Sequence, residues 1–212
     1  MKCFDIVTEA DARVLEYGSS IALSAGGHIT PLALDTLRQR RVTVVRDAAD
    51  QDSSALAPVA RIERVAVAGD HTSLSLKAAL LTHLRGRGLA AEDLGTHSSE
   101  PVDYPDTAAA AARAVARGEA HAGVAIDGSG IGSAVAANKI HGVRAAMCPS
   151  PMLARYGREH NGLNVLTLGA ATMSRDEALA ILDAFLDTPM REPRYIRRLA
   201  IIRGLEVGTR SR

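Results

Sequence analysis

The amino-acid sequence predicts an α/β fold with a parallel sheet for residues 59–212, preceded by a small mixed α/β module in residues 1–58. Two patterns predict the sheet: apolar runs alternate with helical segments five times, and with only 3% aromatic residues Ala, Val, Leu and Ile must fill the core. A polar, small-residue stretch at residues 46–55 has the composition of a linker between the two parts.

The alternation begins at residues 65–68, an apolar run typical of a strand buried on both faces. Later strands are predicted at residues 89–94, 123–126, 143–147 and 164–168. Helices are predicted from residue 74 to 84, and at residues 107–117, 132–139, 152–160, after a capping box at 174–177, and at about 194–203. Right-handed crossovers between such units give a Rossmann-like, three-layer α/β/α domain with five parallel strands. Ligands bind beyond the carboxyl ends of such strands, so we expect functional residues in the loops after them.

The first 45 residues have another pattern. Apolar runs at residues 21–24 and 42–45 flank a Gly26-Gly27 turn and a short helix opened by Pro31. A module of this size buries little core alone, so we expect it to pack on the main domain or on a partner.

Composition excludes several classes of function. A net charge of +1 gives no general attraction to nucleic acid or to membranes, and no apolar stretch approaches the ~20 residues of a membrane span. Two cysteines without a CxxC pair predict neither a disulfide framework nor a zinc site. Asp5, Glu9 and Asp11 stand where a signal peptide would be basic and then apolar. We therefore expect a cytoplasmic protein with no cofactor and no metal.

The loop after the third predicted strand reads Asp127-Gly-Ser-Gly-Ile-Gly132 and leads directly into a helix. Glycines at every second position let the backbone approach a ligand, and the helix start adds N–H groups, so the loop suits an anion or a developing oxyanion. A dinucleotide-binding loop has the spacing GxGxxG after the first strand instead. The remaining alternative is a tight turn without a ligand.

Two acidic residues directly follow predicted strands. Asp127 is a candidate general base if desolvation raises its pKa above the usual ~3.9; its alternative role is to cap the turn. Asp70 and His71 suit the orientation of hydroxyl or phosphate groups, or form a helix cap with an exposed imidazole.

Basic residues mark two later segments. His160 either shuttles a proton or complements a helix C-terminus. Arg191, Arg194 and Arg198 are spaced to share one helical face, where guanidinium groups grip a phosphate or are simply solvated.

Together and in this order, these motifs resemble the type B ribose-5-phosphate isomerase family, which includes galactose-6-phosphate isomerase subunits. The resemblance extends from about residue 65 to 205. It is carried by Gly69-Asp-His71, Val102-Asp-Tyr-Pro105, Gly128-Ser-Gly-Ile-Gly132, Ala136-Ala-Asn-Lys139, Arg144-Ala-Ala146, Arg158-Glu-His-Asn161, Asn164-Val-Leu166, and Arg194 with Arg198.

The resemblance implies an aldose–ketose isomerase of a small phosphorylated sugar, acting through a cis-enediolate without a metal. It implies that His160 assists ring opening and that Arg194 and Arg198 hold the phosphate of a neighbouring subunit's substrate, hence a homodimer or a dimer of dimers. The other implied contacts are backbone N–H groups for the enediolate, from Gly128, Ser129, Gly130, Ile131 and Gly132, and pocket contacts from Asp70, His71, Tyr104 and Asn161.

The sequence departs from the family at the base. Asp127 stands where many members have a catalytic Cys, and Ser133 where another branch has Glu, so Asp127 is the predicted base. Tyr195 replaces a His common beside the first phosphate Arg. A catalytically weakened sugar-phosphate-binding or scaffold protein is the alternative hypothesis.

The N-terminal module resembles leader segments of ethanolamine-utilisation proteins, among them a cobalamin adenosyltransferase, through residues 6–13, 29–33 and 37–38. This implies recruitment to a bacterial microcompartment or an enzyme assembly through residues 1–58. The alternative is a module that covers the active site.

Overall fold

The computed structural model describes residues 2–46 and 56–206. Contacts divide the chain into two compact units, Met1–Leu56 and Ala57–Arg212. The predicted linker lies outside the described residues except for residue 46, which ends a strand. Among the described residues, no helix has the length and hydropathy needed to cross a membrane.

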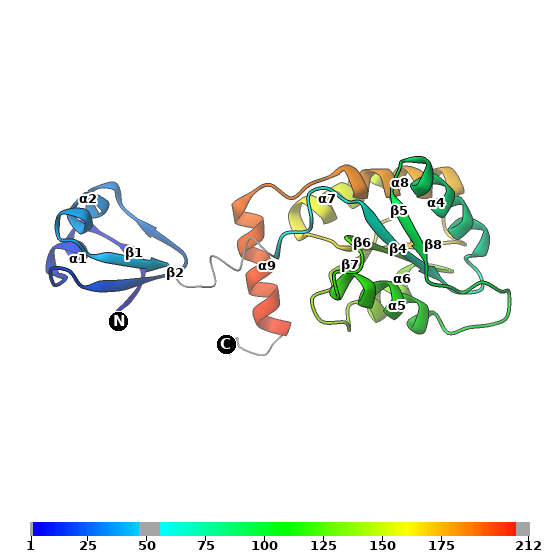
Figure 1. Ribbon diagram of the computed structural model, residues 1–212, viewed down its shortest axis with the longest axis horizontal. Helices are drawn as coiled ribbons and strands as arrows, with labels where there is room; N and C mark the ends of the chain where they lie inside the picture. The colour runs from blue at the N-terminus through cyan, green and yellow to red at the C-terminus, as the bar shows by residue number, and fades with distance from the viewer. Residues whose placement is uncertain (1, 47–55, 207–212) are drawn as a thin grey trace. The chain divides into compact units, whose positions relative to one another are not determined.

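The second unit contains a five-stranded, all-parallel sheet with strand order β5-β4-β6-β8-β7 (Figure 1). Its strands are β4 (Arg64–Gly69), β5 (Ala90–Asp93), β6 (Ala122–Asp127), β7 (Ala145–Met147) and β8 (Val165–Gly169). The inner strands β6 and β8 are buried along their whole length, which is why both read as continuous apolar runs.

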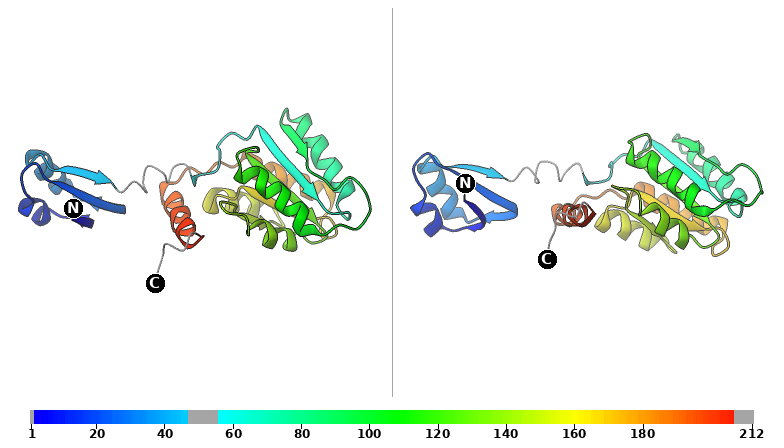
Figure 2. Two further views of the ribbon diagram at one scale, coloured as in Figure 1. Left: turned by 60° about the horizontal axis from the view of Figure 1, so that its bottom comes forward. Right: turned by 90° about the horizontal axis from the view of Figure 1, so that it is seen from below.

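Helices cover both faces of this sheet, as the two views of Figure 2 show. Helices α4 (Leu74–Gly86), α7 (Pro151–Asn161) and α8 (Arg175–Asp187) pack on one face, and α5 (Tyr104–Ala116) and α6 (Ile131–Ala137) on the other. The last helix, α9 (Pro193–Glu206), packs against α7. The predicted Rossmann-like, three-layer domain is therefore confirmed.

Local sequence explains the ends of these helices. The Ser150 side chain accepts from the Leu153 N–H, Pro151 occupies the first turn, and Gly162 ends α7 in a left-handed conformation. Helix α5 starts at Tyr104, three residues before the predicted start, because Pro105 is tolerated in a first turn. Alanines bury the inner face of α5 against β4 and β6, which suits a domain with few aromatic residues.

The first unit is a β–α–β–α–β module with its own parallel sheet in the order β1-β2-β3. Its elements are β1 (Cys3–Val7), α1 (Glu9–Val14), β2 (Ser20–Ile29), α2 (Pro31–Gln39) and β3 (Thr43–Arg46). Sequence patterns missed β1 and α1, although Thr8 and Asp11 form a capping box that starts α1. The module has a core of its own, formed by Val7, Ala12, Leu15, Ile21, Leu23, Ala33, Leu37 and Val42.

Candidate active site

Several predicted site residues meet at the carboxyl edge of the five-stranded sheet. Asp70 and His71 follow β4, Asp127 ends β6, and Tyr104 starts α5. Gly69 pairs with Ile126 in the sheet, and the Asp70 N–H donates to the Ile126 carbonyl at 3.0 Å. Asp70 and Asp127 therefore lie at the ends of adjacent strands.

The Asp127 carboxylate is held by the loop that follows it. Its Oδ1 accepts from the N–H groups of Ser129 at 2.7 Å and Gly130 at 2.6 Å, and its Oδ2 from the N–H of Ser133 at 2.7 Å. The Ser129 hydroxyl donates weakly to Oδ1 at 3.4 Å. The residue is only 4% exposed. Asp127 thus closes an Asx-type turn and accepts from the first turn of α6.

These contacts decide the ionisation of Asp127. Burial acts to raise the pKa of its carboxyl, but hydrogen bonds from Ser133, Ser129 and Gly130 outweigh burial, and the pKa lies below the ordinary value. The condition set for Asp127 as a general base, a pKa raised by desolvation, is not met. The glycine-rich loop directs N–H donors at its own first residue, and these donors stabilise the ionised carboxylate.

The same contacts change the expected oxyanion cradle. The Ser129 and Gly130 N–H groups already donate to Asp127, and the Ile131 N–H donates to the Ser129 hydroxyl at 3.2 Å. Among the described residues, no acceptor takes the N–H groups of Gly128 and Gly132. Of the five N–H donors predicted for an enediolate, these two remain available.

Steric contacts explain two of the glycines in this loop. Gly130 has φ +78, and a Cβ there would lie 2.8 Å from the Leu168 carbonyl carbon and 2.9 Å from Met147 Cγ. A Cβ at Gly132 would lie 2.6 Å from the Tyr104 ring. Tyr104 therefore lies against the loop, and the glycines permit both close approaches.

Asp70 and His71 have simpler surroundings. Asp70 is 6% exposed, and its Oδ1 accepts from the Thr72 N–H at 2.9 Å and the Thr72 hydroxyl at 2.6 Å. The Val102 N–H donates to Nδ1 of His71 at 3.2 Å. That bond assigns the ring proton of a neutral His71 to Nε2, which is then a donor for a hydroxyl or phosphate group.

A second group of predicted residues lies elsewhere. His160, near the end of α7, stacks on Tyr156 at 5.1 Å between ring centroids and contacts Tyr195 of α9 at 4.6 Å. The guanidinium groups of Arg194 and Arg198 lie 4.8 and 5.5 Å from the Tyr195 ring centroid. Asn161 is exposed beside His160. We call His160, Tyr195, Arg194 and Arg198 the α7–α9 cluster.

The α7–α9 cluster and the Asp127 loop of the same copy lie near opposite ends of strand β8. Asp127 pairs with Gly169 at the end of β8, whereas His160 precedes Val165 at its start. At about 3.3 Å per residue the two ends of this strand are about 13 Å apart. His160, Asn161, Arg194 and Arg198 lie on helices α7 and α9, so these candidates do not share the predicted position in loops after strands.

Sequence reasoning missed other residues near the candidate site. Lys77 is 3% exposed, and its ammonium donates to Asp93 and to the Thr96 carbonyl, in the segment that leads to Val102. Its signal in the sequence was a lysine three residues after Leu74 and four before Leu81, on the apolar face of α4. Tyr156, which stacks on His160 from four residues earlier in α7, was missed as well, and its exposed position gave no comparable signal.

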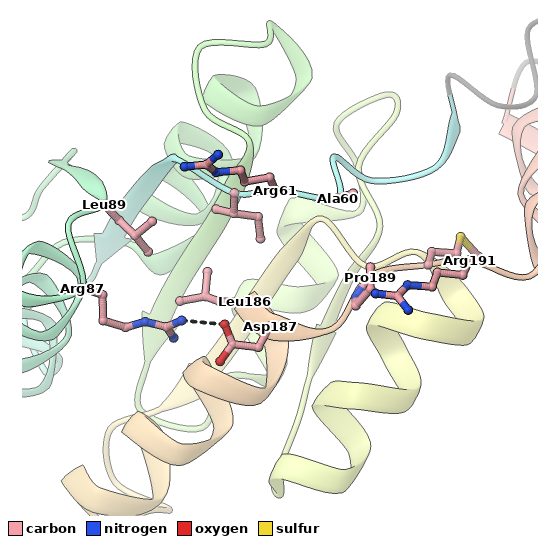
Figure 3. Close-up of a pocket in the computed structure, with 10 residues that line it drawn as sticks. Ala60, Arg61, Arg87, Leu89, Leu186, Asp187, Pro189 and Arg191 are labelled. Carbon is pink, nitrogen blue, oxygen red and sulfur yellow. Dashed lines mark hydrogen bonds and ion pairs between the residues drawn. The ribbon is translucent and has the colours of Figure 1, made fainter.

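Arg191 does not share a helical face with Arg194 and Arg198, because α9 starts only at Pro193. It lines a surface hollow of about 390 Å³ together with Arg61, Arg87 and Asp187 (Figure 3). Arg87 donates to Asp187 there, and apart from Arg191 no predicted site residue lines this hollow.

Comparisons with known proteins match one family. The model of a family described as Ribose/Galactose Isomerase matches residues 65–202. Ribose-5-phosphate isomerase B of Escherichia coli is 39% identical over 145 residues, which cover 68% of this chain and 97% of that protein. The structure of Clostridium thermocellum ribose-5-phosphate isomerase B aligns with a TM-score of 0.67 and 38% identity over 69% of this chain and 99% of that one. A Mycoplasma genitalium structure with bound ribulose-5-phosphate aligns with a TM-score of 0.65 and 34% identity, over 68% of this chain and 96% of that one.

Proposed function

This chain belongs to the ribose/galactose isomerase family and is an aldose–ketose isomerase of a small phosphorylated sugar, and we propose that the sugar is ribose 5-phosphate. The relatives named ribose-5-phosphate isomerase B support this substrate, as does the neighbour with bound ribulose-5-phosphate. Assays with phosphorylated tetroses, pentoses and hexoses test it: the highest kcat/KM should belong to the ribose 5-phosphate and ribulose 5-phosphate pair.

The observation that carries the proposed site is the meeting of Asp70, His71, Tyr104 and the Asp127 loop at one sheet edge. The Nε2–H of His71 donates to a sugar or phosphate oxygen, and Tyr104 covers one side of the sugar. The N–H groups of Gly128 and Gly132, with the Ser129 hydroxyl, bind the oxygens on which the enediolate charge develops. Asp127 holds this loop in shape.

The α7–α9 cluster completes the site of a second copy. His160, Arg194 and Arg198 lie together but about a strand length from the carboxyl edge of their own sheet. A two-fold symmetric pair would bring the cluster of each copy to the edge of the other. Arg194 and Arg198 then hold the phosphate and His160 assists ring opening, with Asn161 beside it. The proposed unit is a homodimer, or a dimer of dimers.

Complementation tests this arrangement. Asp70→Asn and Arg198→Ala each remove one half of a shared site, and each homodimer should be nearly inactive. When the two variants are unfolded and refolded together, the mixed dimer has one intact site of two. Random pairing then restores about a quarter of the wild-type activity. Mixtures that stay as inactive as the separate variants contradict a shared site.

One observation favours the weaker alternative, a sugar-phosphate-binding or scaffold protein: Asp127 puts a carboxylate into the N–H cradle. Proton exchange at C2 of ribose 5-phosphate in deuterated water separates the two functions. An isomerase exchanges this proton even when net conversion is slow. A protein that binds the sugar phosphate and exchanges nothing is a binding protein.

For residues 1–58 we propose recruitment of the isomerase to a cytoplasmic enzyme assembly or bacterial microcompartment. Their separate core supports a module that works independently of the isomerase unit. Residues 59–212 expressed alone should stay folded and keep their kcat/KM, and residues 1–58 should carry a fluorescent protein to the assembly. Aggregation of residues 59–212, or a large loss of kcat/KM, would instead favour a module that covers the active site.

A further inference from the structure

We propose that Asp70, and not Asp127, is the base that moves the proton between C2 and C1 of the sugar. The inference rests on the proposed isomerase function and deepens it, because it names the proton-transfer group. It starts from a difference in the free lone pairs of the two neighbouring carboxylates.

Asp127 has little capacity left for a substrate proton. An ionised carboxylate offers about four lone-pair sites. Three of them accept the N–H groups of Ser129, Gly130 and Ser133 at 2.6–2.7 Å, and the Ser129 hydroxyl lies at 3.4 Å from Oδ1. Proton abstraction by Asp127 would weaken bonds that hold the loop in place.

Asp70, in contrast to Asp127, accepts hydrogen bonds through only one of its two carboxylate oxygens. Thr72 donates twice to Oδ1 and so fixes the carboxylate. Oδ2 accepts no hydrogen bond from any residue in the ranges 2–46 and 56–206, and this oxygen is not fully buried. A carboxylate that is 6% exposed, oriented through one oxygen and open through the other has the properties of a positioned base.

The other titratable groups at this edge fit the step less well. His71 accepts through Nδ1 and carries its proton on Nε2, so it is a donor. Lys77 is engaged with Asp93 and Thr96. Cys148 follows β7 and is 2% exposed; burial raises the pKa of its thiol to about 11, so it stays protonated.

The step balances without a co-reactant. Oδ2 of Asp70 takes the proton from C2 of the open-chain aldose. The C–H electron pair becomes the C1–C2 double bond, and the carbonyl pair moves to O1. The O2 proton then passes to O1, the electron pair on O2 re-forms a carbonyl at C2, and protonated Asp70 returns its proton to C1. The product is the ketose, and the carboxylate is regenerated.

The test measures exchange of the C2 proton of ribose 5-phosphate in deuterated water by NMR, alongside net isomerisation. Asp70→Asn should lose at least ~10²-fold in both rates, the contribution of a general base, while calorimetry still detects ribose 5-phosphate binding. In Asp70→Ala, added formate should restore exchange in proportion to its concentration. Asp106→Asn, an exposed change of the same charge in the first turn of α5, is the matched control and should keep wild-type rates.

The possible results distinguish failure of the Asp70 assignment from failure of the isomerase function. Asp70→Asn with exchange within tenfold of the wild type overturns the assignment, and so does an Asp70→Ala protein that binds ribose 5-phosphate but is not rescued by formate. A wild-type protein that exchanges no proton in any tetrose, pentose or hexose phosphate overturns the isomerase function itself.

Discussion

The loops after β4 and β6 start alike and end differently. Each begins with an aspartate at the end of a buried strand and leads to a helix, and the two strands are neighbours. Asp70 accepts from one residue, Thr72, through one oxygen. Asp127 accepts from three residues through both oxygens.

Glycine explains the difference. Gly130 at φ +78 lets the β6 loop curl until successive N–H groups converge on one point. The β4 loop has no glycine between Asp70 and α4, so only the Thr72 groups reach the carboxylate. A glycine-rich loop therefore creates an anion cradle, and the residue at the strand end decides whether a side chain of the protein or a ligand fills it.

Asp127→Ala should have the largest effect on stability, because it leaves two buried N–H groups and the half-buried N–H of Ser129 without their acceptor. Charge-assisted bonds of this kind suggest a loss of roughly 2–4 kcal/mol, measured by urea unfolding at pH 7. Asp70→Ala removes only the Thr72 contacts and should cost less. Equal losses in the two variants would contradict the structural contrast between the loops.

The pH dependence of this loss has a definite sign. The folded-state pKa of Asp127 is lowered, so its stabilisation is complete above the ordinary value of 3.8 and disappears as pH falls through the folded pKa. The stability difference between wild type and Asp127→Ala should be constant from pH 7 to 5 and shrink below about pH 4. A difference that grows in acid would mean that the pKa is raised.

The sequence predicted the sheet, the order of its elements and the residues of the carboxyl edge, because apolar periodicity and glycine spacing are local signals. It did not predict the ionisation of Asp127, which depends on where Ser133, six residues away, directs its N–H. Nor did it place His160 and Tyr195 in contact. Those contacts depend on how α9 returns to α7, and no local pattern contains that information.

For the N-terminal module, the sequence patterns missed two elements themselves, β1 and α1. Residues 6–13 were interpreted only as part of a leader segment, because residues 3–7 form a short apolar run that Asp5 interrupts and that shows no clear strand pattern. The parallel pairing of β1 with β2 supplies the missing information, since it places Val7 beside Ile29 in the core of the module.

Gly130→Ala should be the next largest change. The alanine must adopt φ near +78, and its Cβ would clash with the Leu168 backbone and Met147. Strain and overpacking together should cost about 1–3 kcal/mol, measured by thermal unfolding. Gly118→Ala is the matched control, since Gly118 has φ +72 but nothing within 4 Å of the new Cβ. If both variants lose the same stability, strain alone explains Gly130.

Asp127→Cys tests whether the Asp127 carboxylate occupies N–H groups that could otherwise bind an anionic ligand. A neutral thiol removes the carboxylate from the cradle and releases the N–H groups of Ser129 and Gly130. A hydroxamate analogue of the enediolate should therefore bind about tenfold more tightly than to the wild type, or ~1.4 kcal/mol, by calorimetry. Inorganic phosphate should show a smaller gain. Weaker binding of the analogue would mean that Asp127 contacts it directly.

Thr72→Val should have the smallest effect and tests the other loop. The change deletes the hydroxyl that donates to Asp70 at 2.6 Å and keeps the backbone N–H at 2.9 Å. Because Thr72 is exposed, stability should fall by only about 0.5–1.5 kcal/mol.

The kinetic effect tests how Asp70 is oriented. If the Thr72 hydroxyl orients the open oxygen of Asp70, kcat should fall several-fold with little change in KM. Thr72→Ser, which keeps the hydroxyl, should recover most of the loss. Thr82→Val removes a comparable hydroxyl on the exposed side of α4 and controls for the methyl substitution. A Thr72→Val protein with unchanged kcat would mean that the Thr72 N–H alone orients Asp70, and that the β4 loop needs a single donor where the β6 loop uses three.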